Sequence, residues 1–409
     1  MRRRGFLRLS LGCAGGLVVG GLPWRLLAAP TGGSGARVVL VFLRGAYDAL
    51  SVLVPYSEPF YYEARPNIAL GRPDRASPDA ALSLDGRWAL HPSLGDALMP
   101  LWQAGQLAFV PFSGTGFVSR SHFQAQDWVE FGQAPDARPS SSDGFLNRLL
   151  ARLGAPAATR SGGVSFTQTM PPVFQGKVQV ANSPLTLPRG GRGVEADYES
   201  LLLRMYSGHP LEETVRDGLG LRREITREIA EEMQAASREA LPAGSFALEA
   251  GRVGKLLHEH PGYSLAFVDV GGWDTHAGQG AAQGALANRL NGLGDGLKAL
   301  ADGLGPQWEK TVVVVISEFG RTFRENGSRG TDHGHGSAIW VLGGSVRGGA
   351  IRGEQGGLKP GDLHEDRDLP VLNEYRAVLG GIFQKLYGLR QDDLTEVFPG
   401  ASVLDLGLV

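Results

Sequence analysis

The sequence is nearly free of cysteine. Its single thiol belongs to Cys13, inside an N-terminal segment that we expect to be removed. The remaining chain can therefore form neither a disulfide bond nor a thiolate ligand to a metal. This excludes iron–sulfur clusters and cysteine-type zinc sites, so any metal ion would be bound by His, Asp and Glu side chains.

Positive charge is also scarce. The whole chain has 40 Lys and Arg against 42 Asp and Glu, and five of the arginines (Arg2, Arg3, Arg4, Arg8 and Arg25) lie in that N-terminal segment. What remains has 35 basic and 42 acidic side chains, a net charge of −7. An acidic protein binds nucleic acids and anionic membranes poorly, so we expect neither as a partner.

The N-terminal segment lacks a continuous apolar run of membrane-spanning length. Its apolar stretch at residues 9–27 is rich in glycine and is interrupted by Pro23 and Arg25, whereas a span needs about 20 apolar residues. Just before it, residues 3–7 (RRGFL) match the twin-arginine export pattern. Residues 1–29 are therefore predicted to be a twin-arginine signal peptide, with the translocation machinery as a partner. We expect a periplasmic or otherwise exported protein, without a stable membrane span in its mature form.

Short apolar runs rich in β-branched residues predict buried strands. They show little alternation, which is typical of central parallel strands covered on both faces. Between them lie stretches whose apolar residues recur at helical spacing, as at residues 123–131, 281–304 and 373–387. This alternation predicts an α/β fold with a mostly parallel sheet. The predicted strands are residues 38–43, 107–112, 264–270, 311–316 and 338–342.

The region at about 135–260 differs from the rest of the predicted domain, which spans residues 36–409. It opens with a connector rich in Pro and Ser at 135–142 and carries charged helical stretches such as 213–238. Residues 190–260 show no clear strand. We predict a mainly helical insertion or cap over the sheet.

Polar side chains gather where the predicted strands end. In open α/β sheets, ligands bind beyond the carboxyl ends of the strands. Four strand ends would therefore bring carboxylate, hydroxyl, imidazole and guanidinium groups to one rim. The polar loops are residues 44–48, 114–122, 271–276 and 317–322, together with 331–336 just before the fifth strand.

Two pairs of side chains in these loops have a spacing that suits a metal ion. Asp274 and His276 are two residues apart, as are His333 and His335, so each pair would point the same way in an extended loop. The alternative for the first pair is structural, with Asp274 capping the next helix and His276 bonding to the backbone. The alternative for His333 and His335 is a simple polar turn. Asp332 is either a ligand or the partner that orients His333.

Two further carboxylates end predicted strands. Glu318 follows a very apolar strand, so it is a ligand, a general base, or the ion-pair partner of Arg321 or Arg324. Asp48 is either a metal ligand or a helix cap.

One serine stands at the start of a predicted helix. Ser121 precedes His122, where backbone N–H groups and the helix dipole favour anions. This position suits a nucleophile that attacks phosphate or sulfate, with Ser119 as the other candidate. An N-cap role for Ser121 is the alternative.

The combination of these motifs resembles the bacterial family catalogued as domain of unknown function 1501, over nearly the whole mature chain. That family is typically exported by the twin-arginine route and is similar in fold to the alkaline phosphatase and sulfatase superfamily. The resemblance implies a three-layer α/β/α sandwich with the sheet between helices. It is carried by residues 42–48 (FLRGAYD), 90–92 (LHP), 120–123 (RSHF), 272–276 (GWDTH), 317–322 (SEFGRT) and 332–336 (DHGHG).

The resemblance also implies roles for individual residues. Asp48 would take the place of the first metal-binding carboxylate, and Ser121 that of the nucleophile. Asp274 and His276 would bind one metal ion, with either His333 or His335 as the last ligand.

The sequence departs from the superfamily pattern at one motif. The superfamily has an Asp-His pair after the next strand, but this chain has Glu318-Phe319 there, so one imidazole is lost. His335, Asp332 or His122 could compensate for it. Otherwise a second metal ion would be bound weakly or not at all.

These observations predict an exported, metal-dependent hydrolase or transferase that acts on phosphate or sulfate esters, either small molecules or polymers. A divalent ion (zinc, manganese, calcium or magnesium) would polarise the ester oxygens. Arg120 or Arg321 would hold the anion through a bidentate fork. The alternative is a non-catalytic exported binding or assembly protein that keeps the fold with a degraded metal site.

Overall fold

The computed structural model of the chain describes residues 35–136, 143–154, 162–185, 203–209, 212, 216, 237–238 and 240–409. The predicted signal peptide at 1–29 lies outside them, and so does most of the predicted helical stretch 213–238. Within the described ranges, no helix has both the length and the apolar character needed to cross a membrane.

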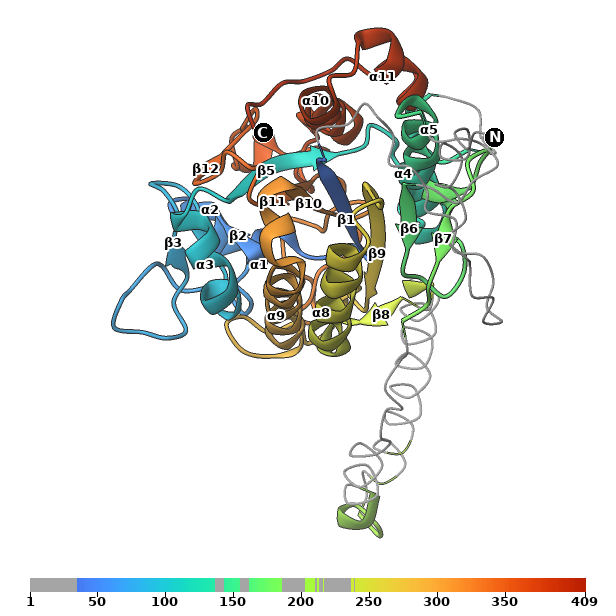
Figure 1. The fold of residues 1–409 in the computed structure, drawn as a ribbon. Coiled ribbons are helices and arrows are strands. Elements are labelled where there is room, and N and C mark those ends of the chain that lie inside the picture. The colour runs from blue at the N-terminus through green and yellow to red at the C-terminus, as the bar shows by residue number, and fades with distance from the viewer. Residues whose placement is uncertain are drawn as a thin grey trace, which may run out of the picture.

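A large central sheet occupies the middle of the molecule (Figure 1). Its strands are β1 (Arg37–Leu43), β5 (Leu107–Gly114), β6 (Gly163–Ser165), β7 (Ala181–Asn182), β8 (Leu241–Pro242), β9 (Leu265–Gly271), β10 (Thr311–Ile316), β11 (Ser337–Leu342), β12 (Ala350–Ile351) and β13 (Asn373–Glu374). They follow the order β12-β5-β11-β10-β1-β9-β6-β7, with β8 beside β9 and β13 beside β5. The predicted strands are confirmed, with small shifts at their ends.

The sheet is mostly parallel, as the sequence predicts. Parallel pairing joins β10, β1, β9, β6 and β7, whereas β11 runs antiparallel between β10 and β5. A separate small sheet has the order β2-β4-β3 and is formed by β2 (Leu53–Val54), β3 (Leu82–Ser83) and β4 (Ala89–Leu90).

Both faces of the central strands are buried, which explains their unbroken apolar sequences. Along β1, Val39 and Val41 contribute to the core on one side of the sheet, while Val38 and Leu40 contribute to the core on the other. Side chains alternate between the faces of a strand, so a strand covered twice needs apolar residues at every position.

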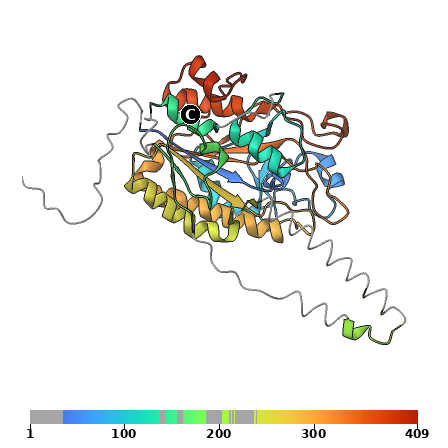
Figure 2. The same ribbon diagram turned by 90° about the vertical axis from the view of Figure 1, so that its right-hand side faces the viewer.

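Helices cover both faces and make a three-layer α/β/α sandwich (Figures 1 and 2). α8 and α9 pack together on one face, and α5, α10 and α11 lie on the other. The predicted helices at 123–131, 281–304 and 373–387 correspond to α4, α9 and α10. The helices are α1 (Ala49–Val52), α2 (Pro59–Ala64), α3 (Gly95–Gln103), α4 (His122–Phe131), α5 (Phe145–Arg152), α8 (Ala243–Glu259), α9 (Ala285–Leu304), α10 (Tyr375–Tyr387) and α11 (Gln391–Val397).

The described parts of the predicted insertion at 135–260 take part in the sandwich itself. β6 and β7 extend the central sheet beside β9, and the short strand β8, within the stretch 190–260 where no clear strand was expected, also pairs with β9. α5 and α8 belong to the two helical layers. The strands β6 and β7 are too short to give a period in the sequence, and this is why composition alone assigned the region to a cap.

One edge of the sheet collects the polar loops. β1, β9 and β10 are parallel, so their carboxyl ends share this edge. β5 runs in the same direction because β11 is antiparallel to both β10 and β5. The amino end of β11 therefore lies at this edge too, and the loop before it joins the loops that follow the other strands.

Candidate metal centre

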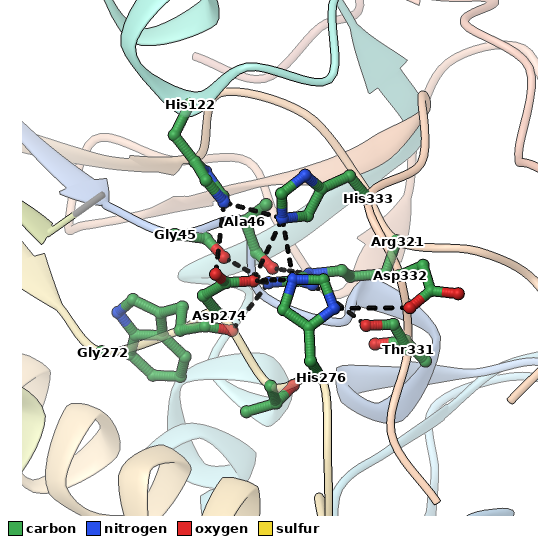
Figure 3. Close-up of polar contacts among 12 residues, drawn as sticks. Gly45, Ala46, His122, Gly272, Asp274, His276, Arg321, Thr331, Asp332 and His333 are labelled. Atoms are coloured by element: carbon green, nitrogen blue, oxygen red, sulfur yellow. Dashed lines mark hydrogen bonds and ion pairs between the residues drawn. The ribbon is translucent and has the colours of Figure 1, made fainter. Parts of the chain in front are cut away.

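Three side chains from separate loops converge at the polar edge of the sheet (Figure 3). His122 is the first residue of α4, Asp274 follows β9, and His333 precedes β11. One ligand atom of each lies within 4.8 Å of those of the other two. His122 and Asp274 are almost fully buried, at 3% and 1% exposure.

His276 adds a third imidazole to this group. Its Nε2 atom lies 2.9 Å from Oδ1 of Asp274 and 2.9 Å from Nε2 of His333. Nε2 of His122 is also 2.9 Å from Nε2 of His333. His333 thus lies between the other two imidazoles and beside the carboxylate, and we call these four residues the His–Asp cluster (His122, Asp274, His276 and His333).

The other nitrogen of each ring faces an oxygen atom. A carboxylate or carbonyl at Nδ1 places the proton there and leaves the Nε2 lone pair directed at the centre, as in metal-binding histidines. The Nδ1 contacts are His122 to Glu318 Oε1 at 2.7 Å, His333 to the Arg120 carbonyl at 2.8 Å, and His276 to Asp332 Oδ1 at 3.4 Å.

The His–Asp cluster fits a divalent metal ion. Neutral rings with protonated Nδ1 atoms would set unshared Nε2 lone pairs against each other at 2.9 Å, which is repulsive unless a cation lies among them. Oδ2 of Asp274 is buried, and its polar neighbour among the described residues is Nε2 of His122 at 3.5 Å, longer than an ordinary hydrogen bond. Buried polar atoms are seldom left without a partner, so this oxygen is a further donor for an ion.

The carboxylate of Asp274 is held ionised. In the metal-free site, burial opposes ionisation, but hydrogen bonds from His122, His276 and His333, donated when their Nε2 atoms carry protons, and the charge of Arg321 keep the pKa of Asp274 far below the ordinary value. Arg321 is buried and forms a salt bridge with Oδ1 of Asp274. Its guanidinium also donates to backbone carbonyls, so it fixes the carboxylate and has no free edge for a substrate anion.

Glu318 lies behind His122 and does not face the centre. It is fully buried, and its Oε1 accepts hydrogen bonds from the Gly45 amide at 2.8 Å and the Gln126 side chain at 2.9 Å. Burial opposes ionisation of Glu318, but the bond and charge of His122 lower its pKa to about 2. Burial also opposes protonation of His122, yet Asp274 and Glu318 raise its pKa to about 9. Both values describe the metal-free site.

Asp48 is not brought into the His–Asp cluster. Its two oxygens accept from the Arg65 guanidinium at 2.6 and 3.0 Å, and Oδ2 also accepts from Ser51 and Gln279, each at 2.7 Å. Asp48 stands before α1, but its side chain makes no capping bond there. The structure therefore gives it a buried salt bridge in place of the ligand or capping role considered from the sequence.

The remaining predicted residues surround the cluster. Asp332 is half-exposed and contacts the outer nitrogen of His276, as an orienting partner would. His335 turns away, with its ring centre 4.5 Å from that of His364, and burial lowers its pKa to about 4. Arg120 is 50% exposed and pairs with Glu365 at 3.1 Å.

Ser121 is the N-cap residue of α4, immediately before the cluster residue His122. Its side chain makes no capping hydrogen bond, so the structure does not show the N-cap role that was the alternative to a nucleophile. The hydroxyl of Ser119, in contrast, bonds to Gln124 at 2.9 Å and accepts from the Ser121 amide.

A line of buried polar residues behind the cluster was not anticipated. Gln126 and Glu130 follow His122 at intervals of four residues along α4, and both bind Nη1 of Arg44, at 3.0 and 2.8 Å. Nε of Arg44 donates to Asp269 at 2.6 Å. The four-residue spacing places these side chains on one helical face, which was the signal available in the sequence.

The fold and the cluster define an α/β protein with a candidate His–Asp metal centre at the carboxyl edge of its sheet. The sequence model of the family described as "Protein of unknown function (DUF1501)" matches residues 35–398. The chain belongs to this family, which confirms the resemblance seen in its motifs. A search among curated proteins gave no match to the sequence.

Solved structures with a similar chain path have low sequence identity. Lipoteichoic acid synthase LtaP from Listeria monocytogenes has a TM-score of 0.42 and 9% identity, over 92% of this chain and 76% of that chain. The C-terminal periplasmic domain of EcEptC from Escherichia coli, in complex with Zn, has a TM-score of 0.36 and 12% identity, over 78% and 77%. A protein in the alkaline phosphatase superfamily from Vibrio parahaemolyticus has a TM-score of 0.35 and 12% identity, over 77% and 62%.

Replacing Glu318 by glutamine tests the orientation of His122. The variant keeps the size of the side chain but removes the charge that holds Nδ1 protonated, so we expect metal affinity to fall by about 10- to 100-fold. Competition with a chromogenic chelator measures this. The exposed Glu309→Gln variant is the matched control, and equal affinities for the two variants would contradict the assignment.

Replacing Asp48 by alanine separates its salt bridge from a ligand role. Arg65 would be left buried without its counter-ion, so the free energy of unfolding should fall by about 3–5 kcal/mol in urea titrations. The exposed Asp96→Ala variant should change it by no more than about 0.5 kcal/mol. Metal content should stay unchanged in Asp48→Ala, or in the milder Asp48→Asn if the first does not fold. Loss of the ion from the folded milder variant would make Asp48 a ligand.

The chelator-treated protein should lose stability as the pH rises. The pKa of His122 is raised from 6.5 to about 9. Its contribution to the free energy of unfolding is therefore complete below pH 6.5 and is lost as the pH rises through about 9. The contribution of Glu318 to the free energy of unfolding is present above pH 4.5 and is lost as the pH falls through about 2. Urea midpoints at about pH 6 and about pH 9 measure the difference. Metal affinity should change in the opposite direction, because protons compete for Nε2. A chelated protein that is as stable at the higher pH would refute the expectation.

Proposed function

We propose that this protein binds one divalent metal ion through His122, Asp274, His276 and His333, and hydrolyses or transfers phosphate or sulfate esters. The observation that carries the proposal is the position of His333 Nε2, which lies 2.9 Å from Nε2 of His122 and 2.9 Å from Nε2 of His276, beside the buried carboxylate of Asp274. Substrates would be small molecules or polymers that carry such an ester.

The donor set narrows the choice of metal. Three imidazole nitrogens and one carboxylate suit zinc or manganese, whereas calcium and magnesium prefer oxygen ligands in larger number. When bound, such an ion would act as a Lewis acid that neutralises the charge of the ester oxygens. Of the metals considered from the sequence, zinc and manganese are therefore the ones we propose.

Ser121 remains the proposed nucleophile. Its hydroxyl is free of capping bonds, and it stands at the N-terminus of the ten-residue helix α4, whose first residue is His122. The Ser121 oxygen would form a bond to phosphorus or sulfur as the bond to the ester oxygen breaks, and the alcohol would leave with a proton. Exposed N–H groups of the helix would favour the negative charge at this place.

Export is part of the proposal. Residues 3–7 (RRGFL) carry the twin-arginine pattern, and a route for folded proteins allows a metal ion to be bound before transport. We propose a periplasmic or otherwise exported location. The net charge of −7 beyond the N-terminal segment supports the absence of a nucleic-acid partner.

A non-catalytic, metal-binding protein is the second candidate, and one observation favours it. Asp48, the expected carboxylate of a second ion, is held by Arg65. Arg321, an expected anion clamp, is held by Asp274 and by backbone carbonyls. With these two residues engaged elsewhere, the site keeps an ion but has fewer groups for turnover.

Metal analysis of protein purified without chelator tests the shared part of both candidates. We expect one zinc or manganese ion per chain, and its loss from the double variant Asp274→Ala and His276→Ala, because two of the four ligands disappear. Elemental analysis by mass spectrometry measures the content. A wild-type protein without a stoichiometric ion, or a double variant that keeps it, would exclude both candidates.

A screen with phosphate and sulfate monoesters and diesters then separates the enzyme from the binding protein. Turnover that disappears in Ser121→Ala and persists in Ser119→Ala supports the enzyme, since Ser121 directly precedes His122 and its side chain makes no capping bond, whereas the hydroxyl of Ser119 bonds to Gln124. A stoichiometric ion without turnover of any ester supports the binding protein.

A further inference from the structure

Arg120 and Arg321, the arginines that the sequence suggested as anion-binding groups, are both paired with carboxylates of the protein. Arg321 is 2% exposed and binds Asp274 and the carbonyls of Gly45 and Ala46. Arg120 is half-exposed and pairs with Glu365, and lies 3.8 Å from Asp368. A phosphate or sulfate group at the His–Asp cluster would therefore need another cation.

The guanidinium of Arg289 has a buried Nη1 atom without an acceptor among the described residues. This residue lies in the second turn of α9, the helix that follows the loop of Asp274 and His276. Guanidinium N–H groups that are removed from water nearly always find an acceptor, because an unpaired one loses hydration without compensation. Arg289 therefore has a binding capacity that the fold itself does not use.

Backbone geometry brings Arg289 beside the end of β9, where the chain leads into the loop of Asp274 and His276. Gly272, two residues before Asp274, has a φ of +91° and no side chain, and a Cβ atom there would lie 3.7 Å from Nε of Arg289. The guanidinium thus passes over the backbone that leads into Asp274. Burial lowers the pKa of Arg289, and the charge of Asp274 acts in the opposite direction.

The charges around Arg289 favour the binding of an anion. Within the cluster, Asp274 is the single negative charge, and it already faces Arg321. A divalent ion on the cluster would add two positive charges near Arg289, and like charges in a partly buried site repel. An oxyanion with several free oxygens can meet both the ion and the guanidinium fork.

We propose that Arg289 binds the oxyanion of the substrate, in the role first considered for Arg120 and Arg321. This inference rests on the proposed metal site and deepens it, because it defines a group with three free oxygens, such as a phosphate or sulfate monoester. Diesters offer fewer free oxygens and should be bound less tightly.

Calorimetric titration of the full, metal-loaded protein with inorganic phosphate and with inorganic sulfate tests the inference. We expect Arg289→Gln to weaken binding of the anion by about 10- to 100-fold, as loss of a charge-assisted pair does. Arg289→Lys should recover part of the affinity because it keeps the charge without the fork. Lys298→Gln, which removes an exposed charge from the same helix, should bind as the wild type does.

Metal content and thermal midpoint are measured on the same samples. Both should be unchanged in Arg289→Lys and Arg289→Gln, which distinguishes a binding role from a structural one. An unaltered anion affinity in Arg289→Gln, or a metal-loaded wild type that binds neither anion, would overturn the role of Arg289 while leaving the metal site in place. A wild type without metal would instead remove the proposed function on which the inference rests.

Discussion

The salt bridge between Arg321 and Asp274 is the contact on which the candidate site depends. Arg321 also donates to the carbonyls of Gly45, Ala46 and Thr331, so one buried side chain joins the loops after β1 and β9 to the loop before β11. A carboxylate as deeply buried as Asp274 stays ionised only beside such a counter-charge. The three imidazoles can converge on Asp274 because Arg321 fixes the position and the charge of this carboxylate.

The strands and the gathering of polar loops were predictable, because both follow from local sequence and from the shared edge of parallel strands. Asp274, His276 and His333 were found in this way, and they do meet. Partner choice was not predictable. Asp48 meets Arg65, and His335 meets His364, through contacts between residues distant in sequence that no spacing rule encodes. The edge strands β6 and β7 were missed because two or three residues carry no period.

The polar line behind His122 links the surface of the site to the interior of the fold. His122 contacts Glu318, Glu318 contacts Gln126, and Gln126 contacts Arg44 at the end of β1. Each group in this line is buried and satisfied by the next, and such networks hold side chains rigidly because no member can move without leaving another unpaired. The position of one imidazole is therefore determined by the packing of α4 against the sheet.

The loops around the cluster interlock through their backbones. Gly334 donates to the carbonyl of Gly320 at 2.8 Å, and a Cβ atom on Gly320 would lie only 1.7 Å from the carbonyl oxygen of Gly336. Backbone packed this closely cannot give way by rotating side chains, so a side chain at position 320 would push the loop after β10 and the loop before β11 apart. Arg321 lies in the first of these loops and His333 in the second, so both would lose their positions around Asp274.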